Sequence, residues 1–177
     1  MIHQTNSQVL MKKTLLFILF SFLIYNVNAQ NDSKELVNKT LDAWHKAAAN
    51  ADYKNYFDEL ADDAFFIGTD ATENWTKQSF EAFAKPYFDK GKAWNFSSIE
   101  RHIYLNDDKT IAWFDELLDT PMKICRGSGV LVLSKGKWKI KHYLLSMTIP
   151  NNTSDEVVKI KSPIEEKFIN ELKNKKE

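Results

Sequence analysis

Apolar residues recur at helical spacing in the stretch after residue 32. Between residues 33 and 50 they stand at i, i+3, i+4 and i+7, which predicts an amphipathic helix. Its predicted inner face consists of Leu36, Val37, Thr40, Leu41, Trp44, Ala47 and Ala48. Asp52 can cap a short second helix, and a third is predicted from about Thr76 to Lys90. Pro86 is expected to kink or interrupt that third helix.

The period of the pattern then changes to two. A brief apolar run at 64–67 predicts a first strand, and alternation predicts four long strands at 94–105, 110–118, 122–133 and 137–149. Polar or Gly/Pro-containing breaks at 106–108, 119–121 and 134–136 are short enough for hairpins, which favours an antiparallel meander. After Pro150 a polar stretch leads to a charged last helix, whose start is predicted at Ser162, where Ser162-Pro163-Ile164-Glu165 resembles a capping box.

The turn at residues 134–136 decides which strand residues share a face. A three-residue loop pairs Ser128 with His142, and the preceding hairpin then pairs Asp115 with Arg126. On this register one inner face carries Trp113, Asp115, Arg126, Ser128, His142, Leu144 and Ser146. A two-residue turn would instead place His142 opposite Gly129. The three-residue loop is favoured because it keeps Trp138, Ile140 and Leu144 inward.

The first 29 residues have the organisation of a leader. Lys12 and Lys13 precede an apolar run at 15–25, and a small-residue ending reaches Ala29, which is typical of a secretory signal peptide. The apolar run is shorter than the ~20 residues that span a bilayer. We therefore expect cleavage after Ala29, a mature start at Gln30 and a periplasmic or secreted protein. Met11 is the more ordinary start, and Met1 an alternative.

Composition excludes several function classes. Without Lys12 and Lys13 the chain has 22 basic and 24 acidic residues, a net charge of −2, which argues against nucleic-acid binding and polybasic membrane docking. Cys125 is the single cysteine, so an intramolecular disulfide is impossible. His45, His102 and His142 lack metal-ligand spacing, so no metal site is expected. No phosphate loop or nucleophile elbow is present, and no cofactor is expected.

Four segments carry a resemblance to a known family. They are Phe66-Ile67-Gly68-Thr69-Asp70 with Trp75, Ala112-Trp113-Phe114-Asp115-Glu116, residues 126–131, and residues 136–146. With the element order, they resemble the SnoaL-like group of the nuclear transport factor 2-like superfamily. The resemblance implies an α+β fold in which a cone-shaped, curved antiparallel sheet wraps around three N-terminal helices, with an additional C-terminal helix. The expected organisation is a cleaved leader at 1–29, the domain at 30–150, and a polar linker with charged helix at 151–177.

Enzymes of that superfamily place an acid or base on the cone floor beside hydrogen-bond donors. A steroid-isomerase-like enzyme would carry a carboxylate where this chain has Phe65 and Phe66, so that activity is poorly matched; Asp70 and Glu73 lie just beyond. The predicted acid, base and orienting cation are Asp115, His142 and Arg126. Each also has a structural explanation: a self-satisfied cross-strand pair for Asp115 and Arg126, and a hydrogen-bonded core imidazole for His142.

The predicted ligand pocket joins aromatic residues to the polar cluster. Its members are Trp44, Phe66, Asp70, Trp75, Tyr87, Trp94, Trp113, Ser128, Leu144 and Ser146. The aromatic members are equally consistent with ordinary core packing. The favoured hypothesis is a module that binds a small, largely apolar molecule. Alternatives are a cofactor-independent isomerase, dehydratase, cyclase or hydrolase, and a scaffold that dimerises through the convex sheet face.

Overall fold

The computed structural model describes residues 32–175. The expected signal peptide and its cleavage site lie outside the described residues. The described chain separates into two compact units, residues 32–146 and 147–175. Each unit is described by itself.

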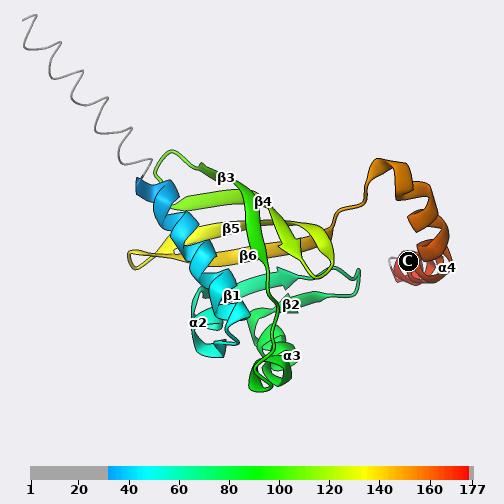
Figure 1. Ribbon diagram of the computed structural model, residues 1–177, viewed down its shortest axis with the longest axis horizontal. Coiled ribbons are helices and arrows are strands. Elements are labelled where there is room, and N and C mark those ends of the chain that lie inside the picture. The colour runs from blue at the N-terminus through cyan, green and yellow to red at the C-terminus, as the bar shows by residue number, and fades with distance from the viewer. Residues whose placement is uncertain (1–31, 176–177) are drawn as a thin grey trace, which may run out of the picture. The chain divides into compact units, whose positions relative to one another are not determined.

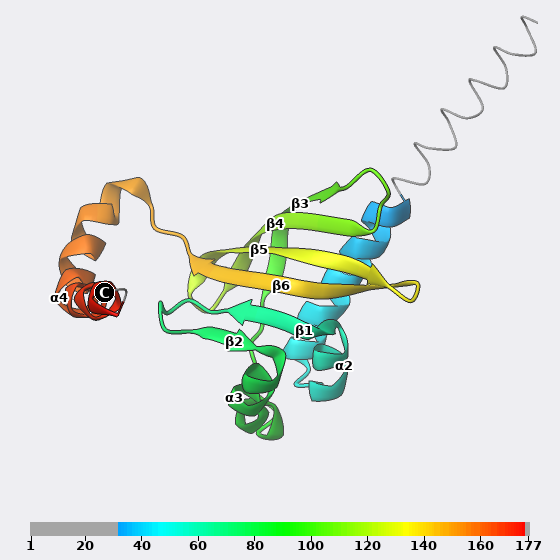
Figure 2. The same cartoon turned by 180° about the vertical axis from the view of Figure 1, so that it is seen from behind.

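The N-terminal helix covers residues 32–49 and lies across one face of the sheet (Figure 1; seen from behind in Figure 2). Val37, Leu41 and Trp44 are buried on its inner side, as its periodicity predicts. The short helix α2 (Tyr53–Asp58) follows, capped by Asp52, whose carboxylate accepts a hydrogen bond from the Asn55 N–H at 3.1 Å.

A short strand absent from the sequence prediction precedes the third helix. β1 (Leu60–Ile67) pairs antiparallel with β2 (Asn74–Thr76), which leads directly into α3 (Lys77–Asp89). Thr76 caps α3 by accepting a hydrogen bond from the Ser79 N–H. The helix continues through Pro86, which therefore does not interrupt it.

The sheet has six strands in the order β2-β1-β6-β5-β4-β3. Its long strands are β3 (Ser97–Leu105), β4 (Ile111–Thr120), β5 (Lys123–Ser134) and β6 (Lys137–Met147). β1 runs parallel to β6, so the sheet is mixed and not purely antiparallel. The curved sheet does not close on itself, and the N-terminal helix, α2 and α3 pack against it, in agreement with the expected α+β cone.

The prediction of which residues of β4 and β5 face inward is wrong. Asp115 pairs with Ser128 and with His102, whereas Leu117 pairs with Arg126. Burial alternates along both strands, and the inward residues are Ala112, Phe114, Glu116 and Leu118 on β4 and Cys125, Gly127, Gly129 and Leu131 on β5. Trp113, Asp115, Arg126 and Ser128 therefore belong to the outer face.

Two local features explain this error. Residues 135 and 136 form a two-residue turn in which Lys135 has φ 50° and Gly136 φ 77°, the backbone that type I′ hairpins require. This is the alternative in which His142 approaches Gly129: a Cβ on Gly129 would lie 2.3 Å from the His142 backbone oxygen. In β6, Ile140 and Tyr143 are both buried although three positions apart, so the alternation is interrupted there. Tyr143 and Leu145 face inward, and Leu144 does not.

The core is rich in aromatic rings that contact one another. Phe66 stacks on Phe80 with ring centroids 4.0 Å apart, and Trp44 stacks on Tyr56 at 5.0 Å. These contacts join the N-terminal helix, α2, α3 and β1. Of these four rings, Phe66 and Phe80 also line the cavity described below.

The C-terminal unit contains a short 3-10 turn (Asn151–Thr153) and α4 (Ser154–Asn174). The predicted helix start at Ser162 is wrong, because α4 begins eight residues earlier and contains Pro163 in its interior. The Ser162 hydroxyl donates to the Val158 carbonyl at 2.6 Å and does not cap a helix start. Across residues 32–175, no helix combines the length and apolar character needed to cross a membrane.

Candidate functional site

Residues 32–146 contain a cavity of about 370 Å³ with a mostly aromatic wall, which we call the aromatic cavity. Seven rings line it: Phe66, Trp75, Phe80, Phe83, Tyr87, Trp94 and Phe96. Its other lining residues are Gly68, Thr69, Glu73, Ala93, Pro121, Met122 and Leu145. The wall therefore joins α3, the β1–β2 hairpin, the segment before β3, the β4–β5 turn and the end of β6.

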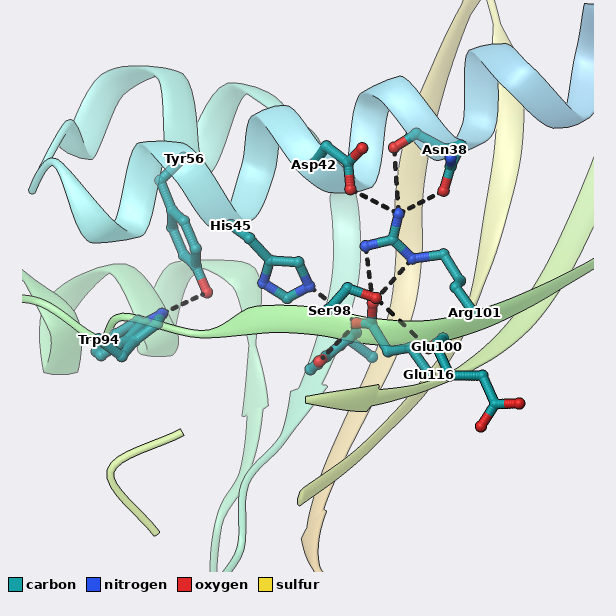
Figure 3. A network of polar contacts seen from close by, with 10 residues as sticks. Asn38, Asp42, His45, Tyr56, Trp94, Ser98, Glu100, Arg101 and Glu116 are labelled. Carbon is teal, nitrogen blue, oxygen red and sulfur yellow. Dashed lines mark hydrogen bonds and ion pairs between the residues drawn. The ribbon is translucent and has the colours of Figure 1, made fainter. Parts of the chain in front are cut away.

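Ring stacking fixes the shape of the cavity. Trp75 stacks on Phe83 with centroids 4.7 Å apart and on Phe80 at 5.5 Å. Trp94 stacks on Phe80 at 5.7 Å and donates its indole N–H to the Tyr56 hydroxyl at 3.2 Å (Figure 3). Phe83 and Tyr87 are 40% and 48% exposed, so two of the lining rings also reach the surface. This arrangement suits a flat apolar ligand.

Within the described part of the chain, Glu73 is the single charged residue that lines the cavity. The β1–β2 hairpin positions it: Gly68 N–H donates to the Glu73 carbonyl at 3.0 Å, and Asp70 N–H donates to the Glu73 carboxylate at 3.1 Å. The carboxylate lies over Gly68, because a Cβ at that position would be 2.2 Å from Glu73 Oε2. A glycine at 68 therefore lets the charge approach the cavity wall.

A second group of polar side chains lies between the N-terminal helix and the sheet (Figure 3). We call it the polar network, and its members are Asn38, Asp42, His45, Arg101, Glu116 and Tyr143. At its centre the side chain of Glu116 on β4 is fully buried. Oε1 accepts from His45 Nε2 at 2.8 Å and from the Tyr143 hydroxyl at 3.2 Å, and Oε2 accepts from Arg101 Nε at 2.9 Å. Arg101 Nη2 also lies 2.8 Å from Oε2 but is poorly aligned for a hydrogen bond, so that contact is an ion pair.

Arg101 also links the network to the N-terminal helix. Its Nη1 donates to Asn38 Oδ1 and forms an ion pair with Asp42 at 2.7 Å (Figure 3). The guanidinium therefore lies between the carboxylates of Asp42 and Glu116, one from the helix and one from the sheet. Arg101 and Glu116, whose side chains are both buried, are each other's counter-charge, which offsets the cost of desolvation, whereas Asp42 is 61% exposed.

Protonation in the polar network follows from its contacts. Burial acts to raise the pKa of the Glu116 carboxyl, but the hydrogen bond from His45 and the charges of His45 and Arg101 outweigh it and hold this pKa below its ordinary range. Burial, together with the neighbouring Glu116 charge, raises the pKa of the Tyr143 phenol well above its usual range. Glu116 is thus a carboxylate whose acceptor positions are occupied.

The polar network does not reach the aromatic cavity. Glu116, His45, Arg101 and Tyr143 are absent from its lining. Phe96, which lines the cavity, has its ring centroid 6.5 Å from that of His45, and Phe66 and Tyr143 stack at 5.5 Å. Of the residues that do line the cavity, the titratable ones are Glu73 and Tyr87. Groups of three or more metal-ligating side chains are not found within residues 32–175.

The structure separates the predicted pocket residues. Phe66, Trp75, Tyr87 and Trp94 line the aromatic cavity. Trp44 lies in the core, and Asp70 is exposed in the β1–β2 loop beside Thr69. The prediction that Trp113, Ser128, Leu144 and Ser146 face the pocket is wrong: Trp113 is 45% exposed and stacks on Tyr104, and Ser146 is exposed.

The predicted catalytic residues do not come together in the cone. Asp115 lies on the outer face, where its carboxylate is 3.2 Å from His102 Nδ1 and not beside Arg126. Arg126 is exposed, and His142 pairs with the exposed Phe65. The inward acid is its neighbour, Glu116. The sequence contains a signal for this residue: Glu116 alternates with the apolar residues Ala112, Phe114 and Leu118. A lone charge on an apolar face needs buried partners, so this pattern indicates a buried polar group.

Comparison with known proteins agrees with this architecture. The family model described as SnoaL-like domain matches residues 37–150. A putative scytalone dehydratase from Novosphingobium aromaticivorans superposes with a TM-score of 0.60 at 9% identity, covering 70% of this chain and 89% of that one. A putative dehydratase of the nuclear transport factor 2-like family from Streptomyces avermitilis gives 0.59 at 11% identity, covering 69% and 99%.

A nuclear transport factor 2-like protein of unknown function from Pseudomonas putida KT2440 gives a TM-score of 0.57 at 14% identity, covering 70% of this chain and 92% of that one. No curated protein is detectably similar in sequence. At these identities the solved structures show the shared fold and nothing finer.

Proposed function

Because the chain belongs to the SnoaL-like domain family, whose members include small-molecule-binding isomerases, dehydratases and cyclases, we propose that it binds a small, largely apolar molecule in the aromatic cavity. One observation carries the proposal: a cavity of about 370 Å³ is lined by seven rings and a single charged side chain. Small-molecule sites have volumes of about 300–1,000 Å³ and mostly apolar walls with few polar groups.

Binding is favoured over catalysis by the separation of the cavity from the polar network. General acid–base catalysis requires a titratable group within hydrogen-bond reach of the reacting atom. Of the two such groups in the lining, Glu73 lies at the β1–β2 hairpin and Tyr87 is half exposed on α3. Glu116 accepts hydrogen bonds from His45, Arg101 and Tyr143 and is absent from the lining of the cavity. Its function is then to hold the N-terminal helix on the sheet.

The binding proposal is tested by filling the cavity without removing a wall residue. Ala93 lines the cavity, and Ala93→Phe adds a ring to its space. Titration with a neutral aromatic probe, 2-naphthol, should change the fluorescence of Trp75 and Trp94 in the unmodified protein, and Ala93→Phe should abolish the change. Leu133→Phe, at a 40% exposed position on β5, is the matched control and should bind as the unmodified protein does. Equal binding by both variants would refute the assignment.

A second candidate is cofactor-independent isomerisation, dehydration, cyclisation or hydrolysis. The residues predicted for it, Asp115, His142 and Arg126, are spread over the outer face, but the buried His45–Glu116 pair at 2.8 Å supplies an acid–base group next to Phe96. Enolisable ketones, hydroxy-ketones and epoxides are suitable test substrates. His45→Gln should then lower the rate by ~100-fold or more while leaving 2-naphthol binding intact. Turnover that survives this change would exclude His45.

A third candidate is assembly through the outer face of the sheet. Trp113 and Tyr104, both 45% exposed, stack there with centroids 5.9 Å apart, beside the 42% exposed Ile111. Such a surface suits a second copy of the chain. Sedimentation analysis should then give a dimer, which Trp113→Lys converts to a monomer; a monomeric unmodified protein would exclude the scaffold.

We also propose that the protein is exported. The basic and apolar pattern at 11–29 predicts a mature protein that starts at Gln30 and acts outside the cytoplasm. Intact-mass measurement on protein from its natural host tests this. A species that retains Met1 or Met11 would contradict it.

A further inference from the structure

We infer that the ligand of the aromatic cavity is an organic ammonium ion, whose apolar part lies against the rings and whose positive charge is neutralised by Glu73. The inference rests on the proposed binding function and specifies its ligand class. It follows from the charge of the lining, the position of the Glu73 carboxylate and the chemistry of the rings.

The described lining of the aromatic cavity carries a negative charge. Glu73 contributes a carboxylate, and no lysine, arginine or histidine of residues 32–175 belongs to the lining. Among residues 32–175, Glu73 forms no ion pair, whereas Glu116 in the polar network is paired with both Arg101 and His45. An uncompensated carboxylate beside apolar walls attracts cations and repels anions.

The Glu73 carboxylate is held in position by its neighbours. Its hydrogen bond from the Asp70 N–H and its contact over Gly68 hold it at the cavity wall. Asp70 is itself held by Thr72, whose N–H and hydroxyl donate to the Asp70 carboxylate at 2.9 and 2.6 Å. One bond from a backbone N–H leaves further lone pairs of the Glu73 carboxylate able to accept hydrogen bonds. An ammonium group supplies both the donors and the opposite charge.

The rings of the lining also favour a cation. Aromatic faces attract cations, tryptophan most strongly, and cages of rings recognise substituted ammonium groups. Trp75 follows Glu73 by two residues and stacks on Phe83, so the carboxylate and a tryptophan lie on the same wall. Trp94 lines the cavity from the segment before β3. A neutral apolar molecule would use the rings and leave the carboxylate unpaired.

Three probes of matched shape test this inference by isothermal titration calorimetry: 2-phenylethylamine, 2-phenylethanol and phenylacetate. The amine should bind at least ~10-fold more tightly than the alcohol, and the anion least tightly. Glu73→Gln should remove the preference for the amine while the alcohol keeps its affinity, because the aromatic walls are unchanged. Raising the salt concentration should reduce the preference in the unmodified protein.

Asp107→Asn is the control, since it removes an exposed carboxylate at a residue that lies outside the lining and outside the β1–β2 hairpin. It should keep the preference for the amine. Equal binding of amine and alcohol by the unmodified protein, or a preference that persists in Glu73→Gln, would overturn the inference and leave the binding function standing. Failure of all three probes to bind would overturn both.

Discussion

His45 and Glu116 are 71 positions apart in the sequence, and their side chains meet at 2.8 Å in the buried space between the N-terminal helix and β4. Their contact fixes the helix to the sheet through charge as well as apolar packing. It also accounts for a glycine on the neighbouring strand, because Gly127, which pairs with Glu116, leaves room for the carboxylate and the Tyr143 hydroxyl.

Glu116→Gln should destabilise the protein by about 3–5 kcal/mol at neutral pH, because it leaves the buried Arg101 guanidinium without its buried counter-charge. Urea unfolding measures this. Asp115→Asn, one residue away but half buried on the outer face, is the matched control and should cost less than about 1 kcal/mol. Equal losses in the two variants would contradict the assigned faces of β4.

Acid pH should weaken the same contact. The folded pKa of Glu116 is lowered from its ordinary 4.5, so its contribution to stability is fully present above that pH and is lost as the pH falls through the folded pKa. The free energy of unfolding, measured from about pH 7 to pH 3, should fall more steeply in the unmodified protein than in Glu116→Gln. Parallel curves would show that Glu116 does not titrate differently on unfolding.

Trp138→Ala should cost about 3–5 kcal/mol, because this ring is buried and a large cavity would remain. Trp113→Ala should cost about 1 kcal/mol or less, since Trp113 is 45% exposed and loses mainly its stacking on Tyr104. Thermal or urea unfolding of both variants compares the two faces of the sheet. A larger loss of unfolding free energy in Trp113→Ala than in Trp138→Ala would show that Trp113 faces the core, contrary to the assigned faces of β4.

Gly127→Ala should destabilise the fold by about 1–3 kcal/mol, because its new Cβ would lie 2.3 Å from the Tyr143 hydroxyl oxygen and 2.9 Å from Glu116 Oε1. In a Tyr143→Phe background the cost should be smaller, since the closest atom is gone. A double-mutant cycle measures this difference. Strict additivity would show that the two residues do not contact each other.

Lys135→Asn should stabilise the β5–β6 hairpin by about 0.5–1 kcal/mol. Lys135 has φ 50° and precedes Gly136 in a two-residue turn, and Asn-Gly is the preferred pair for that backbone. Lys137→Asn, just after the turn, is the control and should not stabilise. A destabilised Lys135→Asn would argue against the type I′ turn.

Local spacing was sufficient to predict the N-terminal helix, α3 and the four long strands, because burial of one face imposes a period of 3.6 or 2. The resemblance of the chain to the SnoaL-like group then predicted the cone. Phe66, Trp75, Tyr87 and Trp94 were predicted from the sequence as pocket residues, and all four line the cavity.

The face of each strand depended on features that spacing does not specify. The turn at Lys135-Gly136 is one residue shorter than predicted, so the residues of β5 and β4 that face inward are the ones predicted to face outward. The irregularity between Ile140 and Tyr143 then brings Tyr143 and Leu145 inward in place of His142 and Leu144. Asp115 and Trp113 therefore face outward and Glu116 inward. The sequence by itself determined the N-terminal helix, α3, the four long strands and four of the rings that line the cavity. Tertiary structure decided which carboxylate is paired in the core and which borders the cavity, since charge pairing needs residues distant in the chain to meet in space.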